Sequence, residues 1–101
     1  AIEKGFDINQ TNYVGKTPLY WACEKGYLEI VELLIEKGAN INKANKYGYT
    51  PLHIACDNGH LEVVKFLIEK GADVKKADNV DRTPLHYACI DGHLEIVNFL
   101  I

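Results

Sequence analysis

Apolar and polar residues alternate along the chain in short blocks with the spacing of amphipathic helices. The clearest block predicts a helix from about Leu28 to Lys37 that stops at Gly38. Its polar face carries three glutamates and its opposite face carries aliphatic side chains: Glu29, Glu32 and Glu36 against Ile30, Val31, Leu33, Leu34 and Ile35. Because this apolar face is wider than one partner helix covers, we expect it to pack against neighbours on both sides.

The chain repeats itself with a period of 33 residues. Thr-Pro-Leu begins at Thr17, Thr50 and Thr83. Four further elements keep the same period, namely Ala-Cys at Ala22, Ala55 and Ala88, Gly at Gly26, Gly59 and Gly92, Leu-Glu at Leu28, Leu61 and Leu94, and Glu-Lys-Gly at Glu3, Glu36 and Glu69. A fixed period of this length is the signature of a repeat architecture.

Each repeat also contains a helix start and a turn. Thr before Pro favours a helix N-terminus. The Thr hydroxyl caps a free backbone N–H, and Pro at the first helical position has no N–H that would be left without a partner. This predicts a helix from Pro18 to about Lys25, ended by Gly26. Between repeats, Asn and Gly three positions apart indicate type I turns at 12–15 and 45–48. The third copy, at 78–81, has Asp81 instead of Gly, and we expect its turn to survive with an altered shape.

These motifs resemble the ankyrin repeat, whose hallmark is Thr-Pro-Leu-His-x-Ala. The segments 50–55 and 83–88 match it fully, whereas Tyr20 replaces His in the first copy. Lys75 stands where Asn9 and Asn42 occur in the other copies. The loop contact expected of Asn at this position is therefore in question for the third copy. The resemblance implies an all-α solenoid of helix-turn-helix units, with projecting β-hairpin-like loops and an L-shaped section.

The predicted organisation is one ankyrin-repeat domain over residues 1–101. Residues 1–16 form the end of a preceding repeat and its loop, 17–49 and 50–82 are full repeats, and 83–101 is a truncated repeat. Terminal repeats normally carry a polar outer face, and neither Ile2 nor the segment 99–101 provides one. We therefore expect a fragment of a longer array, the alternative being a natural short protein with frayed ends.

Composition and charge narrow the function classes. The net charge of −3 and pI of about 5.8 argue against nucleic acid as a partner. No apolar run reaches the roughly 18 residues of a membrane span, so no membrane insertion is expected. The chain contains no Ser, no phosphate-binding Gly-rich loop and no His-Glu-x-x-His. We therefore expect no catalytic residues, no enzyme activity, no cofactor and no small-molecule substrate.

The histidines and cysteines admit two interpretations. His53, His86, His60 and His93 lie near Cys56 and Cys89 in sequence, which makes a metal site conceivable. However, residues that recur once per repeat are separated by about 10 Å, the spacing of packed helices, and do not converge. We expect the histidines to bond adjacent caps and loops, and Cys23, Cys56 and Cys89 to be small buried thiols without disulfides or metal. Unpaired thiols favour an intracellular location, cytoplasmic or nuclear.

The repeats differ from one another mainly on one surface. The resemblance implies that turn tips and first-helix faces line a concave groove, and aromatic residues and Arg are frequent interface anchors. The alternative for Trp21 and Tyr87 is packing between repeats. The candidate partner-binding residues are Tyr13, Lys16, Trp21, Lys25, Lys46, Tyr47, Tyr49, Asp57, Asn58, Asn79, Arg82, Tyr87, Ile90 and Asp91.

Three hypotheses for function follow. The first is a protein–protein interaction module, or scaffold, that binds a protein through this groove. The second is a regulatory or spacer segment of a larger enzyme or channel. The third, a designed repeat protein, is disfavoured by a Cys in every repeat and by irregular loop residues such as Lys75 and Asp81. The apolar ends around Ile2 and Leu100 also suggest self-association.

Overall fold

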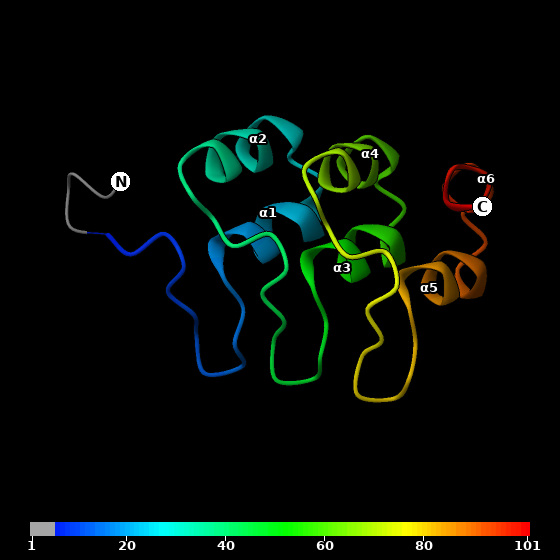
Figure 1. The fold of residues 1–101 in the computed structure, drawn as a ribbon, viewed down its shortest axis with the longest axis horizontal. Helices are drawn as coiled ribbons and strands as arrows, with labels where there is room; N and C mark the ends of the chain where they lie inside the picture. The colour runs from blue at the N-terminus through cyan, green and yellow to red at the C-terminus, as the bar shows by residue number, and fades with distance from the viewer. Residues whose placement is uncertain (1–5) are drawn as a thin grey trace.

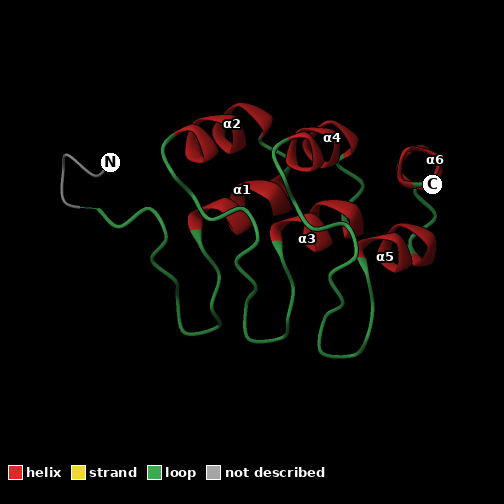
Figure 2. Cartoon of the chain, viewed as in Figure 1, coloured by secondary structure: helices red, strands yellow, loops and turns green. Residues whose placement is uncertain are grey.

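A computed structural model describes residues 6–101 of the chain, which form three helix pairs and no strand in that range (Figure 1, Figure 2). The helices α1, α3 and α5 form one row, the helices α2, α4 and α6 form a second row beside it, and the connecting loops project away from both. Their bounds are α1 Pro18–Lys25, α2 Leu28–Glu36, α3 Pro51–Asp57, α4 Leu61–Glu69, α5 Pro84–Ile90 and α6 Leu94–Leu100. The predicted all-α arrangement of helix-turn-helix repeats is confirmed.

The first helix of each pair begins as the sequence predicts. The hydroxyls of Thr17, Thr50 and Thr83 accept hydrogen bonds from the backbone N–H three residues later, at 3.2, 3.3 and 3.4 Å. Gly26 ends α1 in the left-handed conformation, with φ of 75°. The second helix α2 ends at Glu36, and Lys37 forms its C-cap, one residue earlier than the sequence predicts.

The hydrophobic core runs along the stack between successive helix pairs. Leu19, Leu52 and Val64 are almost fully buried in it. The prediction for the second-helix face needs a correction, because Ile30 and Leu33 of α2 are 48% and 53% exposed. Helix α4 packs against α2 and buries Val63, whereas no described residue covers Ile30, the equivalent position one repeat earlier.

The opposite end of the stack shows a second correction. Cys23 and Cys56 are buried as predicted, but Cys89 is exposed. Helix α5 packs over α3 and covers Cys56, and none of the residues 6–101 covers α5 in the same way. Ile2, predicted to lie at an apolar end, is outside the described residues, as is the first Glu-Lys-Gly copy.

The loops that follow the second helices join one repeat to the next. The side-chain oxygen of Asn9 accepts the Asn40 amide at 2.7 Å, and that of Asn42 accepts the Asp73 amide at 2.9 Å. Lys75, at the third such position, donates its backbone N–H to Asp73 within its own loop. Within residues 6–101 no helix is long and apolar enough to cross a membrane.

Candidate binding groove along the loop edge

An Asn or Asp side chain shapes each projecting loop from within. The Asn45 oxygen accepts the backbone N–H groups of Tyr47 and Tyr49 at 2.9 and 3.1 Å. Asn12 and Asp78 hold their own loops in the same way, each accepting the amides two and four residues further on. The side chains at the tips are therefore presented by loops of one repeated shape.

The third turn survives its substitution. The Asp81 amide donates to the Asp78 carbonyl at 3.0 Å, as the Gly48 amide does to Asn45 at 3.0 Å. The backbone of Asp81 has φ of 68°, where the glycines of the other turns have positive φ as well. The residue thus adopts the left-handed conformation that Asp tolerates better than most side chains.

Adjacent loops are hydrogen-bonded into one continuous edge. The Lys46 amide donates to the Val14 carbonyl at 2.9 Å, and the Asn79 amide donates to the Tyr47 carbonyl at 3.0 Å. The Asn79 side-chain amide donates to the Lys46 carbonyl at 2.9 Å. Asn79 therefore fixes the second loop to the third, in addition to any role in contacting a partner.

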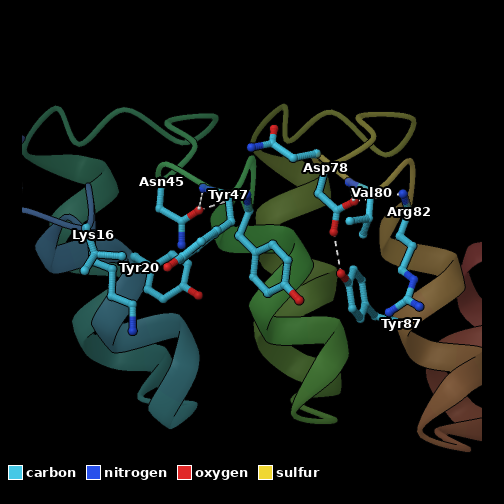
Figure 3. Close-up of a pocket in the computed structure, with 11 residues that line it drawn as sticks. Lys16, Tyr20, Asn45, Tyr47, Asp78, Val80, Arg82 and Tyr87 are labelled. Carbon is cyan, nitrogen blue, oxygen red and sulfur yellow. Dashed lines mark hydrogen bonds between the residues drawn. The ribbon is translucent and has the colours of Figure 1, made fainter.

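A pocket of about 550 Å³ opens between these loops and the first helices. Figure 3 shows Lys16 and Tyr20 at one end of it and Arg82 and Tyr87 at the other. It is lined by Val14, Lys16, Tyr20, Asn45, Tyr47, Tyr49, Asp78, Asn79, Val80, Arg82 and Tyr87. The residues come from three loops together with α1 and α5, so the pocket exists only when the repeats are stacked.

Aromatic rings build its rear wall. The Tyr49 and Tyr87 rings pack edge to face with centroids 5.2 Å apart, and the Tyr49 ring stacks on His53 at 5.8 Å. Tyr87 is only 4% exposed, and its hydroxyl donates to the Asp78 carboxylate. Burial and this hydrogen bond raise the pKa of Tyr87 well above its usual range. The Tyr87 ring is thus held in place between repeats, and it also forms part of the pocket wall. Trp21, at the equivalent position of the first repeat, is 43% exposed.

Asp78 keeps its charge despite being 7% exposed. Burial alone would raise the pKa of this carboxyl, but the hydrogen bonds from Tyr87 and from the backbone amides of Arg82 and Val80 hold it below the usual value. These three donors occupy the carboxylate of Asp78. Asp78 therefore stabilises the third loop and is not free to bind another group.

Three cations lie along the groove against aromatic rings. The Lys16 ammonium is 4.6 Å from the centroid of the Trp21 ring, and the Lys46 ammonium is 5.3 Å from that of Tyr47. The Arg82 guanidinium lies 5.8 Å from the Tyr87 ring centroid. The one ion pair recorded for the described part of the chain joins Lys16 to Glu24 at 3.9 Å.

The far ends of the first helices carry acidic groups. The carboxyl of Asp57 interacts with that of Asp91 in the next repeat. Burial, followed by the hydrogen bond and charge of Asp91, raises the pKa of Asp57 to about 6. The Asn58 side chain donates to the Glu24 carbonyl at 2.9 Å and so joins α3 to α1.

The structure therefore divides the predicted partner-binding residues into three groups. Lys16, Tyr47, Tyr49, Asn79, Arg82 and Tyr87 meet in the pocket. Lys46 and the 94% exposed Tyr13 lie on loops beside it, and Trp21 lines a separate pocket with Phe6 and Lys16. Lys25, Asp57, Asn58, Ile90 and Asp91 lie at or just beyond the C-terminal ends of the first helices and do not line it.

Sequence reasoning missed Tyr20, Asn45 and Asp78 as pocket residues, whereas Val14 and Val80 lie at turn tips, where it placed the groove. A signal for Tyr20 was present, because it replaces His in the hallmark motif of the first repeat. His53 and His86 bond back to Thr50 and Thr83 and complete capping boxes, which Tyr20 does not. The Tyr20 side chain instead lines the pocket.

Each histidine makes a structural hydrogen bond. His53 Nδ1 accepts the Thr50 amide at 3.1 Å, and its Nε2 donates to the Arg82 carbonyl at 3.0 Å. His60 and His93 bond the carbonyls of Glu24 and Asp57 at 2.9 and 3.0 Å. Burial lowers the pKa of His53, which favours the neutral ring. Over residues 6–101, no three His, Cys, Asp or Glu side chains gather into a metal-binding group.

A stack of helix-turn-helix units with a loop edge and a lined groove defines a solenoid repeat protein. A family model for ankyrin repeats in three copies matches residues 1–78 and again residues 44–101. The chain belongs to the ankyrin-repeat family, whose members generally serve as protein–protein interaction modules and are typically not enzymes.

Curated relatives match only part of the chain. A probable E3 ubiquitin-protein ligase of Oryza sativa subsp. japonica is 47% identical over 34 residues, 34% of this chain and 6% of that protein. Acyl-CoA-binding domain-containing proteins 1 and 2 of Arabidopsis thaliana are each 40% identical over 35 residues, 35% of this chain and 10% of each protein. The matched segments thus span a small part of these relatives.

Proposed function

We propose that this chain binds a protein partner through the loop edge and the pocket beneath it, and that it performs no catalysis. The observation that supports this most is the pocket itself, which combines fixed tyrosine walls with exposed cations. Rigid aromatic side chains give contact area at low entropic cost, and Arg adds directional hydrogen bonds. The loop edge is held by backbone hydrogen bonds, so binding requires little ordering.

The test is capture of partners from cell lysate with matched variants. Tyr47→Ala removes a 54% exposed ring at the loop edge, and Tyr27→Ala removes a 56% exposed ring at the start of α2 as the control. Circular dichroism verifies that each variant is folded. We expect Tyr47→Ala, alone or with Trp21→Ala, to lose partners that Tyr27→Ala retains. Equal retention by both would overturn the groove assignment.

A second candidate is a regulatory or spacer segment within a larger enzyme. The relatives favour it, since one is a probable ligase and the shared stretch is 6–10% of each relative. Determining the sequence that flanks residues 1 and 101 in the genome tests this directly. We also propose an intracellular location because the three cysteines are unpaired. Self-association through the stack ends would appear as concentration-dependent mass in sedimentation.

A further inference from the structure

We infer that the pocket between the loops takes a peptide segment that carries a carboxylate beside an apolar side chain. This deepens the proposed function and rests on it, because it names the chemistry of the partner at the same surface.

The charges that remain free at the pocket are positive. Asp78 is the one acidic residue among its lining, and three hydrogen-bond donors satisfy its carboxylate. Lys16 is partly neutralised by Glu24, but Arg82 is exposed and has no acidic partner among the described residues. Lys46 adds a second exposed cation at the rim. In a chain of net charge −3 this is a local reversal of sign.

Arg82 is well placed to receive a carboxylate. Its backbone is fixed, because its N–H donates to Asp78 at 2.9 Å and its carbonyl accepts from His53 at 3.0 Å. Its side chain lies along the Tyr87 ring at the end of the pocket (Figure 3). A planar guanidinium supported on an aromatic face presents parallel N–H groups that match the two oxygens of a carboxylate. Asp81 lies at the tip of the same loop and does not line the pocket.

The rest of the pocket suits an apolar side chain. Tyr20, Tyr47 and Tyr49 provide ring surfaces, and Val14 and Val80 line the pocket from the turns at 12–15 and 78–81. The volume of about 550 Å³ exceeds what one aliphatic or aromatic side chain fills, so a short stretch of peptide backbone enters with it. Arg82 lies against the Tyr87 ring, and the Tyr49 ring packs on Tyr87 with centroids 5.2 Å apart, so the apolar surface begins beside the guanidinium. The acidic and apolar residues of the peptide therefore lie within one or two positions of each other.

The test is selection from a random-peptide phage library with the full chain. We expect enrichment of Asp or Glu within two positions of an aliphatic or aromatic residue. A selected peptide, labelled with fluorescein, is then titrated against the wild type, Arg82→Glu and Arg82→Gln. We expect an affinity loss of about ten-fold or more for Arg82→Glu, a smaller loss for Arg82→Gln, and weaker binding at higher salt. Lys65→Glu, an exposed reversal on α4, is the control and should leave affinity unchanged.

The outcomes separate this inference from the proposed function. Selected peptides without acidic enrichment that still lose binding to Tyr47→Ala would overturn the carboxylate assignment and leave the groove as a binding surface. Equal losses for Arg82→Glu and Lys65→Glu would also overturn it, since the effect would then be one of net charge. If the wild type enriches no peptide, both proposals fail.

Discussion

The hydroxyl of Tyr87 donates a hydrogen bond to the buried carboxylate of Asp78, which ties the third loop to helix α5. The equivalent positions of the other repeats hold neither a carboxylic acid nor a phenol. Position 78 corresponds to Asn45, and position 87 corresponds to Ile54, so the acid and the phenol occur together only in the third repeat. The bond places the Tyr87 ring as the rear wall of the pocket, and it fixes the loop that carries Arg82.

Removing this hydrogen bond should destabilise the fold measurably. Tyr87→Phe leaves the Asp78 carboxylate without one of its donors, and a hydrogen bond to a charged group is worth about 1.5–3 kcal/mol. We expect a loss of that order in urea unfolding. In an Asp78→Asn background, where the amide still accepts the two loop amides as Asn45 does, the same substitution should cost less. Equal costs in both backgrounds would show that Tyr87 acts through packing alone.

The Asp57 carboxyl should make the free energy of unfolding depend on pH in the opposite sense to the Asp78 carboxyl. The folded pKa of Asp57 is raised to about 6, so its contribution is fully present below the ordinary Asp pKa of about 3.9 and is lost as pH rises through about 6. Asp57→Asn should therefore stabilise the chain at pH 7.5, by about 1 kcal/mol after solvent screening, and change little near pH 4.

The measurement is the difference in melting temperature between Asp57→Asn and the wild type at several pH values. Taking the difference removes the contributions of Asp78 and His53, both of which lose stability as pH falls. A difference that stays constant from pH 4 to pH 7.5 would mean that the Asp57 carboxyl does not titrate in this range. Asp91→Asn should weaken the pH dependence, because it removes the like charge that helps to raise the pKa of Asp57.

Replacing Asp81 with Gly should stabilise the third turn, because Asp81 has a left-handed backbone conformation. A non-glycine residue in this conformation costs about 1–2 kcal/mol, which Gly avoids at the expense of a more flexible unfolded chain. We expect Asp81→Gly to raise the free energy of unfolding by about 0.5–1 kcal/mol in chemical denaturation. The reverse change, Gly48→Asp, is the control. A Cβ at Gly48 would lie 2.7 Å from the Asn79 side-chain oxygen, so that variant should be clearly destabilised.

The repeat pattern was sufficient to predict the helices, because Thr-Pro starts and the left-handed Gly26 act locally. It could not predict which side chains meet across repeats. Tyr20 lines the pocket with residues that lie more than 60 positions away in sequence, and Asn79 fixes the third loop to the second. Such contacts depend on the angle between stacked units, which a period of 33 residues does not encode.

The sequence also could not predict which side chains are exposed at the two ends of the stack. Cys56 and Cys89 occupy equivalent positions in matching motifs, yet one is fully buried and the other exposed. A periodic sequence predicts equal environments for equivalent residues, whereas burial depends on whether another helix pair packs over the face. The same reasoning explains why Ile30 is half exposed and Val63 is not.

The three cysteines should therefore react at very different rates with a thiol reagent. Cys23 and Cys56 are fully buried, and burial raises the pKa of each to about 12, so almost no thiolate is present at neutral pH. Cys89 is exposed, and we expect it alone to be modified rapidly by Ellman's reagent in the native chain, with all three reacting in denaturant. Cys89→Ala should abolish the rapid phase and leave the slow one, whose rate reports the opening of the helix pairs. Rapid modification of two or three thiols in the native state would contradict this and would mean that the stacked repeats separate readily.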